Sequence, residues 1–486
     1  MSNSIANLDP KILWKHFYSL TQIPRPSKHE QAAVDFVVKF GKDLGLETIV
    51  DEVGNVIIRK AATPGMENRK GIILQGHLDM VPQKNSDKKH DFEKDPIEAH
   101  IDGEWVTANG TTLGADNGIG VAAAMAVLED TSLVHGPVEA LFTIDEETGM
   151  TGAFNLKPGL LKGDILMNLD SEDEGELYVG CAGGMDANIK LAYKEEAAPA
   201  GYTFVKLSVT GLKGGHSGMD ISSGRGNSIK LLFRFLRYAE KQFNIRLASI
   251  DGGSLRNAIP REAFAVVGVP TDKLSNLEQA AKEHLNIYKA EFSKVEPDMV
   301  FTVDKVDAPK SVIDSKAQWG IIRGVFGCPN GVIRMSDAMP GLVETSTNLA
   351  RVYNENGVIY VQCLLRSSVD TAKEALGEKI ASVFEMAGAE VSFAGSYPGW
   401  KPNMDSAILK AMSEVYKSNW GKTPEIKAIH AGLECGILGG VYPNFDMISF
   451  GPTIRYPHSP DEKVKIDTVD MFWKFLVEVL KNAPQK

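Results

Sequence analysis

Apolar residues in the first third of the chain follow two patterns, a helical spacing and short uninterrupted runs. Spacings of three and four predict amphipathic helices over 8–20, which opens on Asp9-Pro10, and over 28–45. The small-residue run Gly118–Leu128 predicts a closely packed helix. Uninterrupted apolar runs that end in acidic residues or histidine predict buried strands at 71–81, 137–149 and 164–173. Because ligands bind beyond the carboxyl ends of the strands in open α/β sheets, we expect these strand ends to meet at one site.

The pattern changes near residue 187. Residues 203–210 alternate as a half-exposed antiparallel strand does, and 226–241 predict a helix. Residues 254–269 resemble 345–366, with Asn257 and Asn348 in register and a helical segment after each. A single repeat of low identity makes a duplicated α+β unit a hypothesis only.

The α/β pattern resumes near residue 404 and continues to the end of the chain. Residues 446–451 predict a short strand, and 467–481 predict an amphipathic helix capped by Asp467. We therefore expect an α/β catalytic domain that is discontinuous, with an α+β lid domain of two half-units inserted into it. The expected bounds are 1–186 plus 397–486 for the catalytic domain and 187–396 for the lid.

Length and composition agree with this division. A chain of 486 residues is too long for a single hydrophobic core, and 43% hydrophobic and 24% charged residues are typical of globular enzymes. The net charge of −11 disfavours nucleic acid as a partner. The N-terminus lacks the apolar core of a signal peptide, and no apolar stretch is long enough to span a membrane. Four widely spaced cysteines without a CxxC pair indicate reduced thiols, so we expect a cytoplasmic protein.

Nitrogen and oxygen ligands recur at the predicted strand ends and loops. This donor set, which contains no thiolate, suits zinc, manganese or cobalt. His77 and Asp79 lie two residues apart, so both side chains point to the same face, and one can bind a metal while the other orients it. Any one of these residues alone is more often solvated surface. The candidate ligands are His77, Asp116, Glu146, Glu147, Asp170 and His458.

Five ordered motifs connect these residues to a known family. GHLDMVP, GADNGIG, DEETGMTGA, LMNLDSED and YPHSPDE resemble the M20 family of co-catalytic metallopeptidases, and GLKGGHSG resembles its Xaa-His dipeptidase subgroup. The resemblance implies a zinc-peptidase-type domain, with a mixed sheet flanked by helices. It also implies two divalent ions per subunit, with Zn²⁺ expected and Mn²⁺ or Co²⁺ acceptable.

The resemblance implies a role for each residue of the metal site. Asp116 would bridge the ions, with His77 and Asp170 completing one ligand set and Glu147 and His458 the other. Glu146 would be the general base, and Asp79 would orient His77. Relatives carry a cis peptide at the position of Asp116-Asn117.

The same resemblance implies substrate contacts in the insert. His216 matches a histidine that stabilises the transition state, Asn257 a substrate contact, and Arg366 the arginine that pairs with the substrate carboxylate. Glu434, in HAGLECG, either contacts the substrate amine or caps a turn. A surface-loop histidine and a surface-strand arginine remain alternatives for His216 and Arg366.

The expected function is therefore a dipeptidase of broad specificity that accepts Xaa-His and β-Ala-His substrates. An M20 carboxypeptidase, a tripeptidase or an N-acyl amino acid deacylase would share the metal site. An inactive peptide-binding member is disfavoured, because all five metal ligands, Asp79 and Glu146 are present. Small peptides are the expected partners. A homodimer is permitted but not required, since the insert could supply its residues to its own chain.

Overall fold

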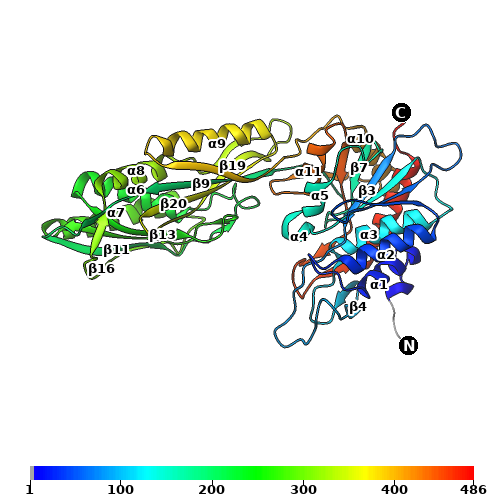
Figure 1. The fold of residues 1–486 in the computed structure, drawn as a ribbon, viewed down its shortest axis with the longest axis horizontal. Helices are drawn as coiled ribbons and strands as arrows, with labels where there is room; N and C mark the ends of the chain where they lie inside the picture. The colour runs from blue at the N-terminus through cyan, green and yellow to red at the C-terminus, as the bar shows by residue number, and fades with distance from the viewer. Residues whose placement is uncertain (1–4) are drawn as a thin grey trace. The chain divides into compact units, whose positions relative to one another are not determined.

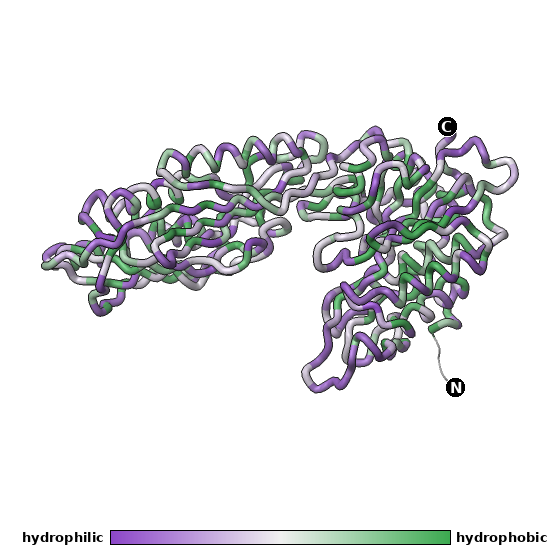
Figure 2. Tube along the Cα trace, viewed as in Figure 1, coloured by the Kyte–Doolittle hydropathy of each residue, from purple (hydrophilic) through white to green (hydrophobic). Residues whose placement is uncertain are grey.

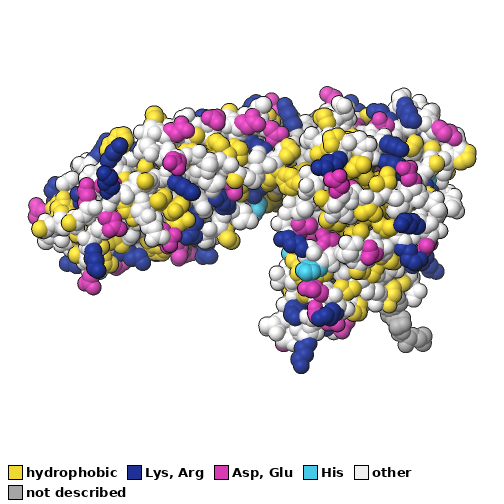
Figure 3. Space-filling view, in the orientation of Figure 1, with side chains coloured by type: hydrophobic (Ala, Val, Ile, Leu, Met, Phe, Trp, Pro, Cys, Tyr) yellow, Lys and Arg dark blue, Asp and Glu magenta, His cyan; other side chains and the backbone are white. Residues whose placement is uncertain are grey.

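The computed structural model describes residues 5–486 and divides into two compact units (Figure 1). Unit 1 consists of the chain up to Gly180, together with Trp400–Ala428 and Leu433–Lys486. Unit 2 consists of Cys181–Gly399 and the short segment Ile429–Gly432. Within residues 5–486, no helix is both long enough and apolar enough to cross a membrane. Figure 3 shows acidic and basic side chains interspersed over the visible face of each unit.

Unit 1 is built on an eight-stranded mixed sheet. Its four neighbouring strands β6, β3, β7 and β23 run parallel. Every residue of β6, β3 and β7 is buried, which explains their unbroken apolar pattern. In sheet order the strands are β1 (Glu47–Val50), β2 (Val56–Lys60), β6 (Val138–Thr143), β3 (Ile72–His77), β7 (Ile165–Asn168), β23 (Asp446–Ser449), β8 (Glu176–Cys181) and β22 (Glu425–Ile429).

Helices cover this sheet, so the predicted α/β fold is confirmed for unit 1. Helix α1 packs on α3, and α3 packs on β3. Hydrophobic positions are frequent along these elements (Figure 2). At Gly120 of α3, a Cβ atom would lie 2.5 Å from the Leu169 carbonyl oxygen, so only glycine permits this approach. The helices are α1 (Lys11–Thr21), α2 (Gln31–Asp43), α3 (Ala115–Glu129), α4 (Glu146–Gly149), α5 (Thr151–Asn155), α10 (Ala407–Trp420), α11 (Glu434–Val441) and α12 (Ile466–Lys481).

A small four-stranded sheet joins the C-terminal segment to an early hairpin of unit 1. Strand β25 pairs with β24 and with β5, and β5 pairs with β4. The strands are β4 (Ala99–Asp102), β5 (Trp105–Ala108), β24 (Ile454–Arg455) and β25 (Lys463–Lys465). The turn between β24 and β25 contains His458, so this sheet holds a residue from the end of the chain beside its first third.

Unit 2 is a nine-stranded antiparallel sheet packed against four helices around one hydrophobic core. The order along its main path is β16, β11, β15, β13, β19, β20, β9 and β21, and β18 pairs with β19. The strands are β9 (Gly183–Ala192), β11 (Tyr202–Thr210), β13 (Arg246–Gly253), β15 (Ala263–Pro270), β16 (Val300–Lys305), β18 (Gly331–Met335), β19 (Val343–Glu355), β20 (Val358–Ser367) and β21 (Glu390–Tyr397). The helices are α6 (Ser228–Phe243), α7 (Leu274–Glu291), α8 (Ser315–Gly327) and α9 (Asp370–Glu385).

The two halves of this sheet have the same topology. Strands β11, β13, β15 and β16 form one half and β9, β19, β20 and β21 the other. When the four strands of each half are numbered in chain order, both halves read 4-1-3-2 from the outer edge of the sheet inward. This symmetry supports a duplication, but not the register expected from the sequence. Asn257 follows β13, whereas Asn348 lies inside the matching strand β19, so the two residues are not equivalent.

Two short sheets complete unit 2. Strand β10 (Glu195–Ala197) pairs with β17 (Ser311–Ile313), and β12 (Gly215–His216) pairs with β14 (Ala258–Ile259). Within residues 5–486, the 3₁₀ helices are η1 (Ile5–Asn7) in unit 1 and η2 (Thr271–Lys273) in unit 2. The β12–β14 pair is the element that brings His216 beside the segment containing Asn257.

Candidate metal centre

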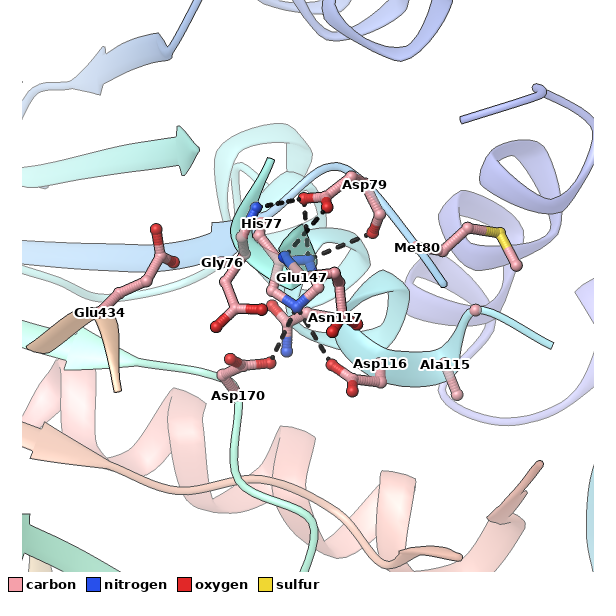
Figure 4. A network of polar contacts seen from close by, with 12 residues as sticks. Gly76, His77, Asp79, Met80, Ala115, Asp116, Asn117, Glu147, Asp170 and Glu434 are labelled. Carbon is pink, nitrogen blue, oxygen red and sulfur yellow. Dashed lines mark hydrogen bonds and ion pairs between the residues drawn. The ribbon is translucent and has the colours of Figure 1, made fainter. Parts of the chain in front are cut away.

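The parallel strands of unit 1 place their chemically active residues at one edge of the sheet. His77 is the last residue of β3, and Asp170 follows β7 by two residues. Strand β6 ends at Thr143 and is followed by α4, which begins at Glu146. Asp116 lies in the first turn of α3, and Figure 4 shows the side chains of His77, Asp116 and Asp170 directed toward one another. The expected convergence of the three strand ends is therefore observed.

Asp116 lies between two histidines. The Nε2 atom of His77 is 3.1 Å from Oδ1 of Asp116 and 3.4 Å from Oδ1 of Asp170. The Nε2 atom of His458 is 3.2 Å from Oδ2 of Asp116 and 3.0 Å from Oε2 of Glu147. Each oxygen of Asp116 thus faces a separate group of side chains.

These side chains fit divalent cations. His77, Asp116 and Asp170 form one group whose ligand atoms all lie within 4.8 Å of one another, and Asp116, Glu147 and His458 form another. Oε1 of Glu147 and Oδ1 of Asp170 are buried and accept no hydrogen bond from the described residues. Burying carboxylate oxygens without partners is unfavourable, and a bound cation removes that cost. This donor set matches the two-ion site that the family resemblance implies.

The pKa values of these side chains are shifted by burial and by one another's charges. Burial and the neighbouring carboxylate of Asp116 raise the pKa of Asp170 to about 8. Hydrogen bonds to Asp116 and Glu147 raise the pKa of His458 to about 11. Burial lowers the pKa of His77, but Asp170 and the other nearby carboxylates outweigh it and raise the pKa. Divalent cations would relieve the repulsion between these buried carboxylates.

Asp79 lies behind His77 and links three segments. Its Oδ1 is 3.3 Å from Nδ1 of His77 and accepts a hydrogen bond from the Glu146 amide at 3.0 Å. Its Oδ2 accepts from the Glu147 amide at 3.2 Å and from Oγ of Ser27 at 2.8 Å. Burial raises the pKa of Asp79, but the hydrogen bond with His77 outweighs it, and the pKa falls to about 2. An ionised Asp79 holds a proton on Nδ1 of His77 and leaves Nε2 for a metal.

Glu146 lies beside the metal-ligand groups. Its carboxylate forms a third group with His77 and Glu147. Burial and the negative charges of Asp170, Glu434 and Glu147 raise the pKa of Glu146 well above its ordinary value, with His77 opposing them. A carboxylate with a raised pKa is suited to accept a proton and release it again.

The backbone between Asp116 and Asn117 is cis, as the family resemblance led us to expect. Both residues have non-helical angles within α3. The Asn117 side chain donates a hydrogen bond of 2.7 Å to the Leu169 carbonyl, one residue before Asp170. Asn117 thereby ties the segment of Asp116 to that of Asp170.

Glu434 is the first residue of α11, and its side chain is buried beside β3 and β6. It is 1% exposed, and its Oε2 accepts hydrogen bonds from Gln75 at 2.5 Å and Thr143 at 2.9 Å. Its other oxygen, Oε1, is buried and accepts no hydrogen bond from the described residues. A polar row continues across the sheet, with Asn168 donating to Gln75 at 2.6 Å and Ser449 donating to Asn168 at 2.5 Å.

The expected substrate residues of unit 2 lie near one another. His216 pairs with Ala258 in the β12–β14 ladder, and the Ser217 amide donates to the Asn257 carbonyl at 2.8 Å. The guanidinium of Arg366 has Nε 3.5 Å from Oγ of Ser217. The paired strands β12 and β14, together with Ser217, thus bring these three candidates near one another within unit 2.

Two of these residues have unusual environments. Nδ1 of His216 accepts hydrogen bonds from the amides of Gly218 at 3.2 Å and Met219 at 3.0 Å, which leaves the proton of the neutral ring on Nε2. Burial and then the charge of Arg366 lower the pKa of His216. Arg366 is 6% exposed and forms no ion pair with a carboxylate among residues 5–486. A buried guanidinium without an anion is suited to bind one.

Sequence reasoning missed several buried polar residues that support the site. Gln75 and Asn168 interrupt apolar strands, and that interruption was the signal available for them. Arg25 and Glu462 lie in Pro-rich loop segments with no pattern of their own, although Glu462 belongs to the YPHSPDE motif.

Comparison with known proteins defines the class. The model of peptidase family M20/M25/M40 matches residues 73–482, so the chain belongs to this family of peptidases. It is 48% identical over 484 residues to the cytosol non-specific dipeptidase of Escherichia coli strain K12, covering all of both chains. The crystal structure of aminoacylhistidine dipeptidase from Vibrio alginolyticus is 50% identical with a TM-score of 0.96, and the match covers 99% of this chain and 98% of that one. A tripeptidase from Staphylococcus aureus shares the fold at 16% identity and a TM-score of 0.56, covering 98% of each chain.

Proposed function

We propose that this chain is a metal-dependent dipeptidase of broad specificity that accepts Xaa-His and β-Ala-His substrates. The observation that carries the proposal is the carboxylate of Asp116, whose two oxygens face two ligand groups with Glu146 beside them. The full-length similarity to two dipeptidases supports the choice of substrate class.

The metal site is assigned as the family resemblance implies. His77 and Asp170 would hold one ion, Glu147 and His458 the other, and Asp116 both. Zn²⁺ is the proposed metal, and the same nitrogen and oxygen donors accept Mn²⁺ or Co²⁺. When bound, the two ions lower the pKa of a water molecule and polarise the scissile carbonyl.

The protein residues complete the chemistry. Glu146 accepts the proton of the attacking water and returns it to the leaving amine, a transfer that its raised pKa favours. Asp79 keeps His77 in the tautomer that has a free Nε2. In this proposal Glu434 supports the site through its hydrogen bonds with Gln75 and Thr143 and does not contact the substrate, because its carboxylate is buried.

The insert, proposed as residues 187–396, would supply the substrate contacts. We propose that the Nε2–H group of His216 donates a hydrogen bond to the oxyanion that forms during hydrolysis, and that Asn257 contacts the substrate. Arg366 would pair with the C-terminal carboxylate, since its guanidinium is buried and lacks an anion. Residues 1–186 and 397–486 would form the catalytic domain.

The location and assembly of the protein are also proposals. A cytoplasmic location agrees with the name of the Escherichia coli relative, a cytosol dipeptidase. A homodimer is compatible with this function, and it is not required if the insert supplies its residues to the site of its own chain.

Hydrolysis and metal assays test the proposed function. The purified protein should cleave Gly-His and β-Ala-His faster than N-acetyl amino acids, lose activity with a chelator and regain it with Zn²⁺. Faster hydrolysis of N-acyl amino acids would favour a deacylase, and faster cleavage of tripeptides a tripeptidase. Tight metal binding without any hydrolysis would refute an enzymatic role.

A further inference from the structure

Glu462 is a buried carboxylate without an assigned role. It is 2% exposed, and its two oxygens accept hydrogen bonds from four consecutive backbone amides. Oε2 accepts from Leu113 at 2.7 Å and Gly114 at 2.9 Å, and Oε1 accepts from Ala115 at 2.8 Å and Asp116 at 3.2 Å. One side chain therefore fixes the whole backbone segment that leads into Asp116.

Arg25 holds the same segment from its carbonyl side. It is also 2% exposed, and its Nη2 donates to the Gly114 carbonyl at 2.5 Å. Its Nη1 donates to the carbonyls of Leu78 at 2.8 Å and Asp79 at 3.0 Å, in the segment after His77. Gly114 has a φ of 70°, and a Cβ atom there would lie 2.6 Å from the guanidinium, so glycine permits this contact.

Glu462 also connects this segment to the other histidine. It follows His458 by four residues, and its amide donates to the Ser459 carbonyl at 3.0 Å. Its carbonyl accepts a hydrogen bond of 2.8 Å from Oγ1 of Thr107 in β5. The turn that carries His458 and the segment that carries Asp116 thus meet at one residue.

We propose that Glu462 is a positioning residue for the metal centre, with Arg25 as its counterpart. Glu462 fixes residues 113–116 so that one oxygen of Asp116 faces His77 and the other faces His458. This inference rests on the proposed function, in which Asp116 is the shared ligand. A carboxylate is required because it accepts at both oxygens, whereas an amide would direct its NH₂ group at two backbone N–H donors.

Zn²⁺ titration of the chelator-treated full-length protein tests this role. The wild type should bind two ions per chain, and Glu462→Gln should bind both 10- to 100-fold more weakly, the range seen when residues that orient metal ligands are replaced. The activity lost in E462Q should return as Zn²⁺ is raised, whereas the activity lost in Glu146→Gln should not. Glu462→Asp, which keeps both acceptors on a shorter side chain, should give an intermediate affinity.

Glu139 provides a matched control away from the metal centre. It is 5% exposed, its Oε2 accepts the amides of Lys162 at 2.7 Å and Gly163 at 2.8 Å, and Arg59 lies 2.6 Å from its other oxygen. Glu139→Gln should lower the melting temperature but leave both Zn²⁺ affinities unchanged.

Three results would overturn the inference. One is wild-type Zn²⁺ affinity in E462Q, and another is an equal loss of affinity in E139Q. If E462Q does not fold, the third result is a wild-type Zn²⁺ affinity in E462D. A wild-type protein that binds fewer than two ions, or cleaves no dipeptide, would instead refute the proposed function before any variant is made.

Discussion

The two units hold their candidate residues in opposite electrostatic settings. In unit 1, buried carboxylates gather around His77 and His458 and raise the pKa of both histidines. In unit 2, burial and the charge of Arg366 lower the pKa of His216, and they lower that of His430 to about 4. Histidine is thus set to bind cations in one unit and to remain a neutral donor or acceptor in the other.

This difference separates two tasks of a hydrolase. An excess of buried negative charge is stable only with cations, which suits the activation of water. A buried guanidinium beside neutral polar groups suits the binding of an anionic peptide end. The variants below test whether the tasks divide between the units in this way.

The largest effect is expected in unit 1. Glu146→Gln removes the proposed proton acceptor but keeps the shape of the side chain, so kcat should fall by roughly 10²- to 10⁴-fold. Two Zn²⁺ ions per chain should remain bound, as measured by elemental analysis. A kcat within tenfold of the wild type would exclude Glu146 as the general base.

The next effect tests unit 2. Arg366→Gln should lower kcat/KM for Gly-His roughly 30-fold, the equivalent of about 2 kcal/mol for a hydrogen-bonded charge, mainly through KM. The wild type should discriminate against a dipeptide amide, which lacks the carboxylate, and R366Q should not.

Arg351 is the control for this variant. It lies in the same sheet with its guanidinium 4.6 Å from the Tyr353 ring centre. Arg351→Gln should behave as the wild type, and a variant R366Q that still discriminates between acid and amide would contradict the proposed carboxylate contact.

A third prediction concerns the dependence of stability on pH. Burial and then Arg366 lower the pKa of His430 to about 4, below the ordinary 6.5, so the folded chain binds fewer protons than the unfolded chain. Stability from this residue is therefore complete above pH 6.5 and is lost as the pH falls toward 4. Between pH 7 and pH 5 the free energy of unfolding should fall by about 2 kcal/mol more in the wild type than in His430→Gln.

Urea denaturation at the two pH values measures this difference. Ser346→Ala is a suitable control, because Oγ of Ser346 lies 2.7 Å from Nε2 of His430 and its loss leaves the ring buried. S346A should keep the wild-type pH dependence. Identical slopes in H430Q and the wild type would show that His430 titrates normally in the folded protein.

The smallest effect is expected at the edge of the metal centre. Ser27→Ala removes one of the hydrogen bonds to Asp79 and leaves the two backbone amides in place. Activity should fall about 2- to 10-fold, since a hydrogen bond contributes about 0.5–1.5 kcal/mol. A loss as large as that of E146Q would mean that Ser27 does more than support Asp79.

Local patterns predicted the elements of unit 1 well. The strands predicted over 71–81, 137–149 and 164–173 correspond to β3, β6 and β7. These elements are recognisable because their apolar periods are local. The family motifs, in turn, identified which polar residues follow the strands.

The features that the sequence did not predict depend on distant partners. Glu434 begins the apolar helix α11 after a Gly-containing loop, and only the folded strands β3 and β6 bring Gln75 and Thr143 to its buried carboxylate. Glu462 resembles any loop glutamate until residues 113–116 are folded beside it. Side chains that bind backbone amides far along the chain leave no period in the sequence.

The position of β23 has a consequence for biosynthesis. This strand lies between β7 and β8, so Asp446 pairs with Ile165, although about 280 residues separate them in the chain. While the ribosome makes the intervening residues, β7 has an open edge of the kind at which nascent chains aggregate. His458 and Glu462 emerge after β23, so a prematurely terminated chain has neither a closed sheet nor a complete metal centre.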